Sequence, residues 1–176
     1  MKEIEVKFSV KDFERIRRNL KQRGAKLLWK GIEQNYFFDT KNRQLKKRRE
    51  VLRVKKIKKK RKDVFLLTFK TGAKGRDVKF KARDEYEIEI NDFLAMQRIL
   101  QKLGFHPWFR YQKRREHWKL GKLSIELDEV RGRRFVELEG EKRGIEKLAR
   151  ELTLHWGNST TKGYLSILNA YARRKN

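Results

Sequence analysis

The chain has 176 residues, 41% of them charged, and a formal net charge of +26. It has no cysteine, which excludes disulfides and thiolate chemistry, and no apolar run approaches the roughly 20 residues of a membrane-spanning helix. Aromatic residues, clear periodicities and a single proline argue against disorder. We therefore expect one soluble, cytoplasmic domain over residues 1–176, without a membrane role and with an anionic partner such as polyphosphate or nucleic acid.

The first half of the chain predicts a strand, a helix and then long extended segments. Residues 2–8 alternate as a strand, and Ser9 with Asp12 signals the start of a helix that ends near Gly24. We assign Asp39 to a turn rather than to a metal site. Extended segments are expected at 26–39, 45–57 and 64–71, with a turn at 41–44 and a basic hairpin tip between the last two.

The second half repeats this order. A strand at 78–90 leads to a helix that begins at Asn91 and stops at Gly104. The phenylalanine-to-glycine spacing is the same over 13–24 and 93–104, which suggests two strand–helix–strand units in a pseudo-symmetric arrangement. The remaining expected elements are a strand at 106–118, a hairpin with strands 123–130 and 134–139, and helices around 145–152 and from Thr160 or Thr161 to Tyr171.

Acidic side chains alternate with apolar ones along several of these strands. In the first strand Glu3, Glu5 and Lys7 share one face, and Ile4 and Val6 lie on the other. Two carboxylates at this spacing repel each other unless a cation or basic groups lie among them. The alternation returns at Glu85, Glu87 and Glu89, at Glu126 and Asp128, and at Glu137 and Glu139.

These patterns favour an α+β fold whose sheet closes on itself. Each helix has one apolar face, which must pack on the apolar faces of the strands. The charged faces of the strands then point toward one another. Because a dry core cannot hold so many charges, we expect an open barrel with a wet, charged lumen and with helices packed outside.

Both signs of charge would face this lumen. Carboxylates from several strands suit a hard divalent cation, Mg²⁺ or Mn²⁺, and convergent bases suit phosphate oxygens. Together they could hold a polyphosphate during phosphoryl transfer, but they do not specify the reaction. The inward bases are Lys7, Arg53, Lys55, Lys70, Arg83, Lys113 and Arg115, and the acids are Glu3, Glu5, Glu85, Glu87, Glu126, Asp128, Glu137 and Glu139.

Plainer interpretations exist for each feature taken alone. Any single alternating strand could carry solvated charges, although alternation on all of them favours a lumen. Seven of the eight residues in 55–62 are basic, which fits a solvated hairpin tip or a nucleic-acid contact. The histidines lack metal-ligand spacing, and the sequence has no glycine-rich phosphate loop.

The N-terminal Glu-x-Glu-x-Lys strand of Glu3, Glu5 and Lys7 resembles the hallmark of the CYTH domain proteins, also called triphosphate tunnel metalloenzymes. The resemblance continues in order through nearly the whole chain, and Gly163-Tyr164 stands where the family has Ser-Tyr. The other matching segments are Phe38-Asp39-Thr40, Leu52–Lys55, Leu67–Lys70, Arg83–Glu87, Lys113–Arg115, Leu127–Val130 and Phe135–Glu139.

The resemblance implies an eight-stranded antiparallel β-barrel, a single CYTH domain, and metal-dependent chemistry on tripolyphosphate, thiamine triphosphate or ATP. Members are triphosphatases or class IV adenylyl cyclases, and residues 103–107 are somewhat similar to the cyclase branch. By position, the resemblance implies that Glu3, Glu5, Asp128, Glu137 and Glu139 hold Mg²⁺ or Mn²⁺, that Lys7, Arg53, Lys55, Lys70, Arg83, Lys113 and Arg115 bind the triphosphate, and that Glu85 and Glu87 orient those bases or a second metal.

One position departs from the family pattern. Hydrolytic members have a tyrosine before the Phe-Asp pair that works with the lysine equivalent to Lys70. Here that position is Phe37, and Tyr36 is one residue earlier, on the opposite face. The alternative function is a non-catalytic polyphosphate- or RNA-binding module, with nucleic acid as a secondary partner, and the chain is expected to be a monomer or homodimer.

Overall fold

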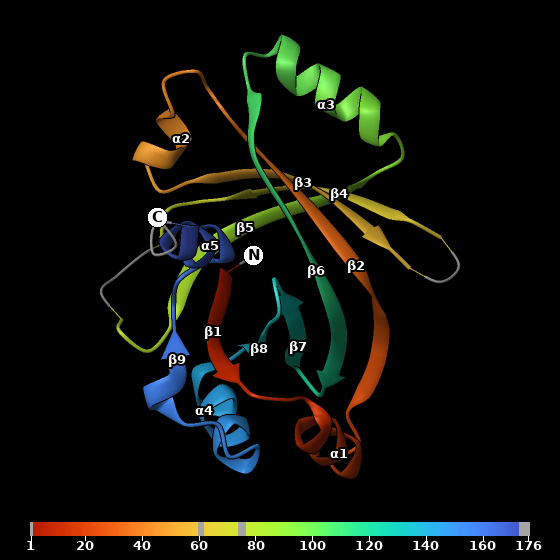
Figure 1. The fold of residues 1–176 in the computed structure, drawn as a ribbon, viewed down its shortest axis with the longest axis vertical. Coiled ribbons are helices and arrows are strands. Elements are labelled where there is room, and N and C mark those ends of the chain that lie inside the picture. Colours follow the sequence, from red (N-terminus) through yellow and green to blue (C-terminus); the bar gives the residue numbers. More distant parts are fainter. Residues whose placement is uncertain (1, 60–61, 74–76, 173–176) are drawn as a thin grey trace.

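The computed structural model describes residues 2–59, 62–73 and 77–172, and it places side chains as far as Leu168. Within these residues eight antiparallel strands close into a barrel in the order β1-β5-β4-β3-β2-β6-β7-β8 (Figure 1), which confirms the predicted fold. The strands are β1 Lys2–Val10, β2 Lys26–Asp39, β3 Val51–Lys58, β4 Val64–Lys70, β5 Lys81–Ile90, β6 His106–Leu120, β7 Leu123–Val130 and β8 Arg133–Glu139, with a two-residue β9, Ser159–Thr160, beside β1.

Helices cover the outer face of the barrel (Figure 1). The helices α1 and α4 pack on β1, β7 and β8 through residues such as Leu20 and Leu148. The helix α3 packs on β3 through Leu100. Among the described residues, none forms a helix that is long and apolar enough to cross a membrane. The helices are α1 Glu14–Gln22, α2 Gln44–Lys47, α3 Phe93–Lys102, α4 Lys142–Glu151 and α5 Tyr164–Ala172, with a 3₁₀ turn, η1, at Trp156–Asn158.

The last helix, α5, packs against lumen-facing residues instead of the outer face. Its Tyr164 and Ile167 contact Phe37, Tyr111 and Phe135, which enter from the strands. One part of the barrel interior is therefore apolar, which the alternation of charges did not predict. The charged part of the lumen lies beside this apolar cluster.

The third strand begins later than expected from the sequence. We expected it over 45–57, but it begins at Val51 because the short helix α2 comes first. Asp39 holds that helix: its carboxylate accepts hydrogen bonds from the backbone N–H groups of Leu45 and Lys46, both at 3.0 Å. Asp39 is thus the last residue of β2 and not itself in the turn, but its carboxylate organises the segment that follows.

Three helix starts also differ from the expected positions. Asp92, not the expected Asn91, caps α3, and its carboxylate accepts the backbone N–H groups of Leu94 and Ala95 at 2.9 Å. In the first unit Ser9 remains inside β1 and does not cap α1. The strand expected from residue 78 begins at residue 81, and Thr160 belongs to β9.

The repeated spacing over 13–24 and 93–104 has a counterpart in the strand order of the barrel. If β1–β4 are exchanged with β5–β8, every pairing in the ring is preserved: β1–β5 and β2–β6 map onto themselves, and β8–β1 maps onto β4–β5. The helix α3 follows β5 as α1 follows β1. The topology therefore has the two-fold pseudo-symmetry that the spacing suggested, with β3 and β4 equivalent to β7 and β8.

Candidate functional site

The lumen is a cavity of about 1100 Å³ lined by charged side chains from all parts of the barrel wall. All the site residues predicted from the sequence line this cavity except Asp128. Asp128 has no exposed surface. Buried charges are stable only when they are paired, so their partners decide what the cavity can bind.

Acidic side chains gather on three neighbouring strands, β7, β8 and β1. Glu126 is directly opposite Glu137 in the β7–β8 pair, and Glu139 is directly opposite Glu5 in the β8–β1 pair. Like charges that face each other across strands destabilise a sheet unless cations intervene. We call this set the acidic wall: Glu3, Glu5, Glu126, Glu137 and Glu139.

Basic side chains gather on β3, β4 and β5, which form another part of the barrel. Because β3 and β4 are pseudo-symmetric to β7 and β8, the two halves carry opposite charges at corresponding places. We call this set the basic wall: Arg53, Lys55, Lys70, Lys81 and Arg83. Lys7 on β1 and the pair Lys113 and Arg115 on β6 add further cations.

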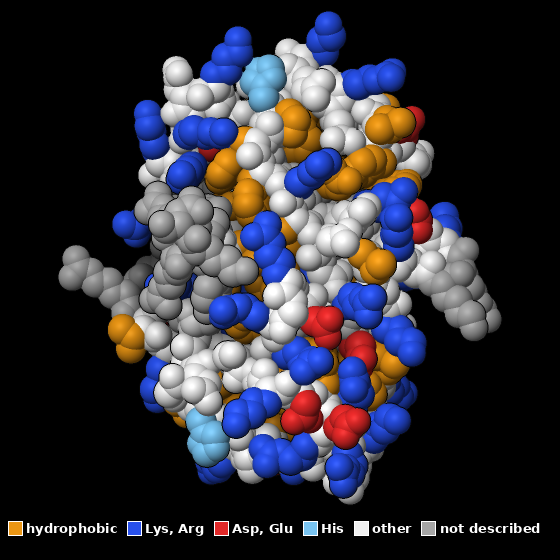
Figure 2. Space-filling view, viewed as in Figure 1, with side chains coloured by type: hydrophobic (Ala, Val, Ile, Leu, Met, Phe, Trp, Pro, Cys, Tyr) orange, Lys and Arg blue, Asp and Glu red, His pale blue; other side chains and the backbone are white. Residues whose placement is uncertain are grey.

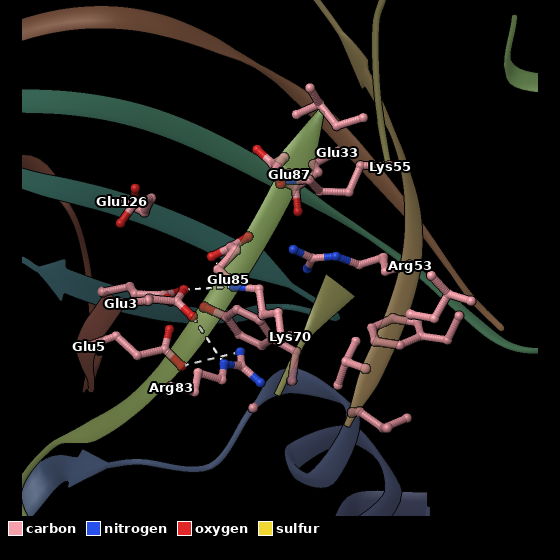
Figure 3. Close-up of a pocket in the computed structure, with 18 of the residues that line it drawn as sticks. Glu3, Glu5, Glu33, Arg53, Lys55, Lys70, Arg83, Glu85, Glu87 and Glu126 are labelled. Carbon is pink, nitrogen blue, oxygen red and sulfur yellow. Dashed lines mark hydrogen bonds and ion pairs between the residues drawn. The ribbon is translucent and has the colours of Figure 1, made fainter. Parts of the chain in front are cut away.

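Glu3 links the two walls (Figure 3). Its carboxylate accepts hydrogen bonds from Lys70 Nζ at 2.7 Å and from Arg83 Nε at 3.0 Å. Lys70 Nζ also lies 2.8 Å from Glu85. Burial alone would raise the pKa of Glu3, but Lys70 and Arg83 outweigh it and lower the pKa to about 2. Glu3 is thus ionised at neutral pH, and Lys70 is held between two carboxylates.

Asp128 lies behind the cavity surface, where several donors hold it. Its carboxylate oxygens are 3.0 Å from Lys113 Nζ and 2.5 and 2.6 Å from the guanidinium of Arg115, and the Tyr164 hydroxyl donates to it at 2.8 Å. Arg115 also donates to Glu137 at 3.1 Å. Asp128 therefore fixes the positions of these bases, and its metal-binding role remains a prediction.

Glu5 and Glu137 share the ammonium of Lys7. The Nζ atom of Lys7 lies 3.0 Å from Glu5 and 2.9 Å from Glu137. A second ammonium, that of Lys81, is 3.3 Å from Glu5. Burial, together with the nearby cations Arg83 and Lys7, lowers the pKa of Lys81 to about 8, although Glu5 acts in the opposite direction.

Two carboxylates of the acidic wall have an oxygen that is in neither a hydrogen bond nor an ion pair within the described residues; a third, Glu5, has a buried Oε1 atom without a hydrogen bond, but the Lys81 ammonium lies 3.3 Å from it. The side chain of Glu139 forms no ion pair or hydrogen bond with any residue in the described part of the chain. The Oε1 atom of Glu126 lies 2.9 Å from His117 Nδ1, but its buried Oε2 atom has no partner. Burial and the neighbouring charges of Glu126 and Glu3 raise the pKa of Glu139 to about 7.

These oxygens fit a hard divalent cation better than any other part of the lumen. Mg²⁺ and Mn²⁺ prefer carboxylate oxygens, and the unpartnered oxygens of Glu126 and Glu139 lie near the ionised Glu3. Among the described residues, no three acidic or histidine side chains already converge as a metal site. A cation would therefore have to draw these carboxylates together and compete with the bases that now hold Glu3.

On the basic wall, Arg53 is the cation without an acidic partner. It forms no ion pair within the described residues, and its buried Nε atom has no hydrogen-bond partner. Figure 3 shows its guanidinium directed into the lumen near Glu85 and Glu87. Lys55 Nζ lies 2.6 Å from Glu87, which also accepts the Thr68 hydroxyl at 2.7 Å. The lumen thus presents the unpaired guanidinium of Arg53 beside Lys55, which the carboxylate of Glu87 holds in place.

The structure confirms that Tyr36 and Phe37 face opposite sides of β2. The ring of Tyr36 packs outside, 5.1 Å from that of Phe93. Phe37 lies inside, stacked on Tyr111 at 5.9 Å. Position 37 therefore contributes no phenolic hydroxyl to the lumen. The phenol beside it is that of Tyr111, whose ring stacks on Phe37.

Sequence reasoning missed several lumen residues. Glu33 is only 2% exposed and lies 3.3 Å from Lys113, and Asn35 donates to it at 3.0 Å. Continued alternation along β2 would have found Glu33, and alternation along β5 would have found Lys81. The contact between Tyr164 and Asp128 joins residues 36 positions apart, and no local pattern could have indicated it.

Comparisons with known proteins agree with this architecture. Residues 1–163 match the CYTH domain family. A Methanocaldococcus jannaschii protein named "Putative adenylate cyclase MJ0240" is 31% identical over 140 residues, which cover 79% of this chain and 77% of that protein.

Solved structures share the fold. PH1819 from Pyrococcus horikoshii OT3 superposes with a TM-score of 0.79 at 25% identity and covers 96% of this chain and 99% of its own. HpAC1 from Hippeastrum, described as having a dominant triphosphatase activity, superposes at 0.68 with 18% identity, over 92% and 91% of the two chains. The family match over almost the whole described barrel and the identity to MJ0240 show that this chain belongs to the CYTH domain family.

Proposed function

We propose that this protein is a divalent-metal-dependent enzyme that acts on a triphosphate, either by hydrolysis or by cyclisation of ATP to cyclic AMP. One observation carries the proposal: a single cavity contains an acidic wall with unpartnered oxygens and a basic wall with an unpaired guanidinium. The printed names support both branches: MJ0240 is named "Putative adenylate cyclase", and HpAC1 is described as a "Putative adenylyl cyclase" with a dominant triphosphatase activity.

The basic wall would bind the phosphate oxygens. Arg53 is free to do so at once, and the planar guanidinium suits two oxygens of one phosphate. Lys55 and Arg83 would exchange their present carboxylate partners for phosphate, at little net cost in charge pairing. The triphosphate would therefore lie along β3, β4 and β5.

The acidic wall would hold Mg²⁺ or Mn²⁺ through Glu126 and Glu139, with Glu3 as a third ligand. When bound, such a cation neutralises phosphate charge and polarises the P–O bonds. Because the acidic wall lies beside the basic wall, the metal ion and the basic side chains would contact the same phosphates. Asp128 would contribute by holding Lys113 and Arg115 in place.

The two branches differ in the attacking oxygen. In hydrolysis, water attacks the terminal phosphorus, the bond to the preceding phosphate breaks, and the water's proton passes to a base. Glu85, whose pKa is raised by burial and by Glu3, is suited to accept that proton while Lys70 orients it. In cyclisation, the ribose 3′-hydroxyl attacks the α-phosphorus and pyrophosphate leaves. Because Phe37 has no hydroxyl, the tyrosine–lysine pair that the resemblance implies for hydrolytic members is missing here, which favours cyclisation over hydrolysis by that pair.

A product assay tests the proposal. The protein is incubated with Mg²⁺ or Mn²⁺ and, in parallel, tripolyphosphate, thiamine triphosphate and ATP. Phosphate release would identify a triphosphatase, and cyclic AMP with pyrophosphate would identify a cyclase. We expect Glu3→Gln and Glu139→Gln to reduce turnover at least 100-fold, because each removes a charge that the transition state needs.

The matched control is Glu141→Gln, which removes an exposed carboxylate two residues beyond the barrel wall. Its turnover should equal that of the wild type. Full activity in both lumen variants would contradict the proposal. Tight, salt-sensitive binding without turnover would favour the polyphosphate- or RNA-binding module, which the basic outer surface in Figure 2 makes the second candidate.

A further inference from the structure

The described helices leave part of the outer face of β2 and β6 uncovered. The helix α1 ends just before β2 begins, and α3 ends just before β6 begins. Because β2 and β6 are antiparallel, the two helices lie at opposite ends of the strand pair (Figure 1). Between these ends, a hollow of about 540 Å³ lies on the side of the barrel wall that faces away from the lumen.

Polar side chains line this hollow. The outward direction is fixed by Tyr36, whose ring packs outside the barrel. Alternation along β2 and the direct pairing of β2 with β6 place the neighbouring side chains on the same face. Further residues enter from β7 and from the turn that follows it. Besides Tyr36, the polar residues on this outer face are Gln34, Arg110, Gln112, Arg114, Glu129 and Arg131.

The three arginines of the hollow have no carboxylate partner. Through their side chains, Arg110, Arg114 and Arg131 form no ion pair or hydrogen bond with another described residue. Glu129 lies directly opposite Arg114, but the cation that its carboxylate approaches is Arg134, at 3.5 Å. The three guanidinium groups are therefore available to an external anion.

The surroundings of these arginines suit phosphate oxygens. Elsewhere on the outer surface, Arg17 has a carboxylate partner, Glu116, at 2.8 Å. In the hollow, the groups beside the arginines include the neutral amides of Gln34 and Gln112. Guanidinium and amide N–H groups both donate hydrogen bonds to phosphate oxygens, and a planar guanidinium can bind two of these oxygens at once.

The positive charge continues beyond the hollow along a row of paired residues. From β3 to β8, successive neighbours in this row are Lys58, Ile32, Arg114, Glu129 and Arg134. Adjacent strands are about 4.8 Å apart, so the cations Lys58, Arg114 and Arg134 follow one another at intervals of roughly 10 Å and span roughly 20 Å. Double-helical nucleic acid carries about a dozen phosphate charges over such a length. The row is therefore much longer than a small anion requires.

We propose that this outer face binds the phosphate backbone of double-helical nucleic acid without preference for base sequence. Recognition of unpaired bases relies on open aromatic rings, but the ring of Tyr36 already packs against Phe93 of α3. The face lies on the opposite side of the barrel wall from the lumen, so the proposal does not depend on the proposed function. We call the site the arginine groove: Arg110, Arg114 and Arg131, with the amides of Gln34 and Gln112.

Fluorescence anisotropy of a labelled DNA duplex of about 20 base pairs tests the proposal, with the salt concentration varied between about 50 and 200 mM. The groove variant combines Arg110→Gln, Arg114→Gln and Arg131→Gln and so loses three phosphate contacts. We expect the slope of log affinity against log salt concentration to decrease in magnitude by about 3, and the affinity at about 0.1 M salt to fall at least tenfold. Two duplexes of different sequence should behave alike.

The matched control combines Arg18→Gln, Arg143→Gln and Arg150→Gln. These exposed arginines lie on α1 and α4, and their side chains also have no ion-pair partner among the described residues. The control variant loses the same charge, so it measures attraction to the net charge of the molecule. We expect its slope to change by less than about 1 and its affinity by less than about threefold. The lumen variant Arg53→Gln should bind the duplex as the wild type does.

Several results would overturn the proposal. Equal losses in the groove and control variants would mean that the duplex responds only to net charge, and a loss in Arg53→Gln would place the nucleic acid at the lumen. Polyglutamate that binds as tightly as the duplex would indicate an acidic protein as the partner. A single strand that binds more tightly than the duplex would indicate recognition of bases. Undetectable duplex binding by the wild type would also contradict the proposal.

The product assay separates this proposal from the proposed function. The groove variant should form product at the wild-type rate, because its substitutions lie outside the lumen. A protein that forms no product but binds the duplex through the arginine groove would contradict the proposed function and leave the present proposal intact. Unfolding temperatures of all the variants, measured in parallel, show whether each one retains its fold.

Discussion

Glu139 illustrates how a single carboxylate of the acidic wall connects stability to pH. Its pKa in the folded protein is about 7, above the ordinary value of 4.5, because of burial and of Glu126 and Glu3. Between these two pH values the folded protein binds more protons than the unfolded chain. The free energy of unfolding must therefore fall as the pH rises from about 4.5 to about 7. A glutamine at this position would remain neutral throughout.

We predict that Glu139→Gln unfolds at nearly the same temperature as the wild type at pH 5 but at a clearly higher temperature at pH 8, without metal. The carboxylate faces a wet cavity, so we expect a gain of about 2 kcal/mol, or roughly 5 °C. Thermal unfolding at the two pH values measures it. Glu141→Gln should show no such pH-dependent difference, and equal shifts at pH 5 and pH 8 would show that Glu139 is not the titrating group.

At this scale the sequence could predict which residues face the lumen but not what they contact. Alternation along a strand is a local property, so Glu3, Lys70 and Glu87 could be placed inside the barrel from the sequence. Whether a carboxylate is free depends on residues from distant strands. Asp128 and Glu139 look equivalent in the sequence, yet Asp128 is held by Tyr164 and two bases while Glu139 has no partner within the described chain.

Among the elements, β2 and β3 show which strand bounds the local sequence pattern can predict and which it cannot. Its bounds, Lys26–Asp39, coincide with the expectation because its alternation and its closing turn are both encoded locally. The start of β3 was misplaced because α2 depends on the carboxylate of Asp39 and on left-handed backbone at Arg43 and Arg49, with φ of 55° and 60°. Tertiary capping of this kind overrides the strand propensity of residues 45–50.

The contact between β2 and the end of β3 gives an element-scale prediction. In Gly31→Ala the added methyl group would meet the Lys58 carbonyl oxygen at 2.1 Å, so the end of β3 must move away from β2. Overpacking of this kind costs about 1–3 kcal/mol. We expect the unfolding temperature to fall by roughly 2–10 °C in thermal unfolding scans.

Gly157→Ala is the matched control for this variant. Its Cβ atom would have no neighbour within 4 Å, so the same methyl group finds open space. We expect its unfolding temperature to stay within about 2 °C of the wild type, since surface changes away from special features are nearly neutral. If both variants unfold alike, the close approach of β3 to Gly31 does not constrain the barrel.

For the molecule as a whole, the pseudo-symmetry explains how one chain makes a cavity with two signs of charge. The two halves have equivalent strand order, but β3 and β4 carry lumen bases where β7 and β8 carry acids. Because lumen acids and bases largely compensate each other, much of the +26 net charge resides on the outside, as the basic side chains in Figure 2 show. Such a surface attracts polyanions generally, so binding alone cannot identify the lumen's ligand.

The ligand of the lumen can be identified by the coupling between metal binding to the acidic wall and triphosphate binding to the basic wall. A triphosphate on the basic wall is repelled by the acidic wall until a cation neutralises the latter, so each ligand should strengthen the binding of the other by the same factor. We predict that Mg²⁺ and tripolyphosphate together raise the unfolding temperature by more than the sum of their separate effects. The expected excess is about 1–3 kcal/mol, or roughly 2–10 °C, with free concentrations held equal in calorimetric scans.

Glu139→Gln should lose this excess but keep the shift caused by tripolyphosphate alone, because the basic wall is intact. Strictly additive shifts in the wild type would mean that the two ligands bind independently, as expected for polyanions on the outer surface but not for ions that share one lumen.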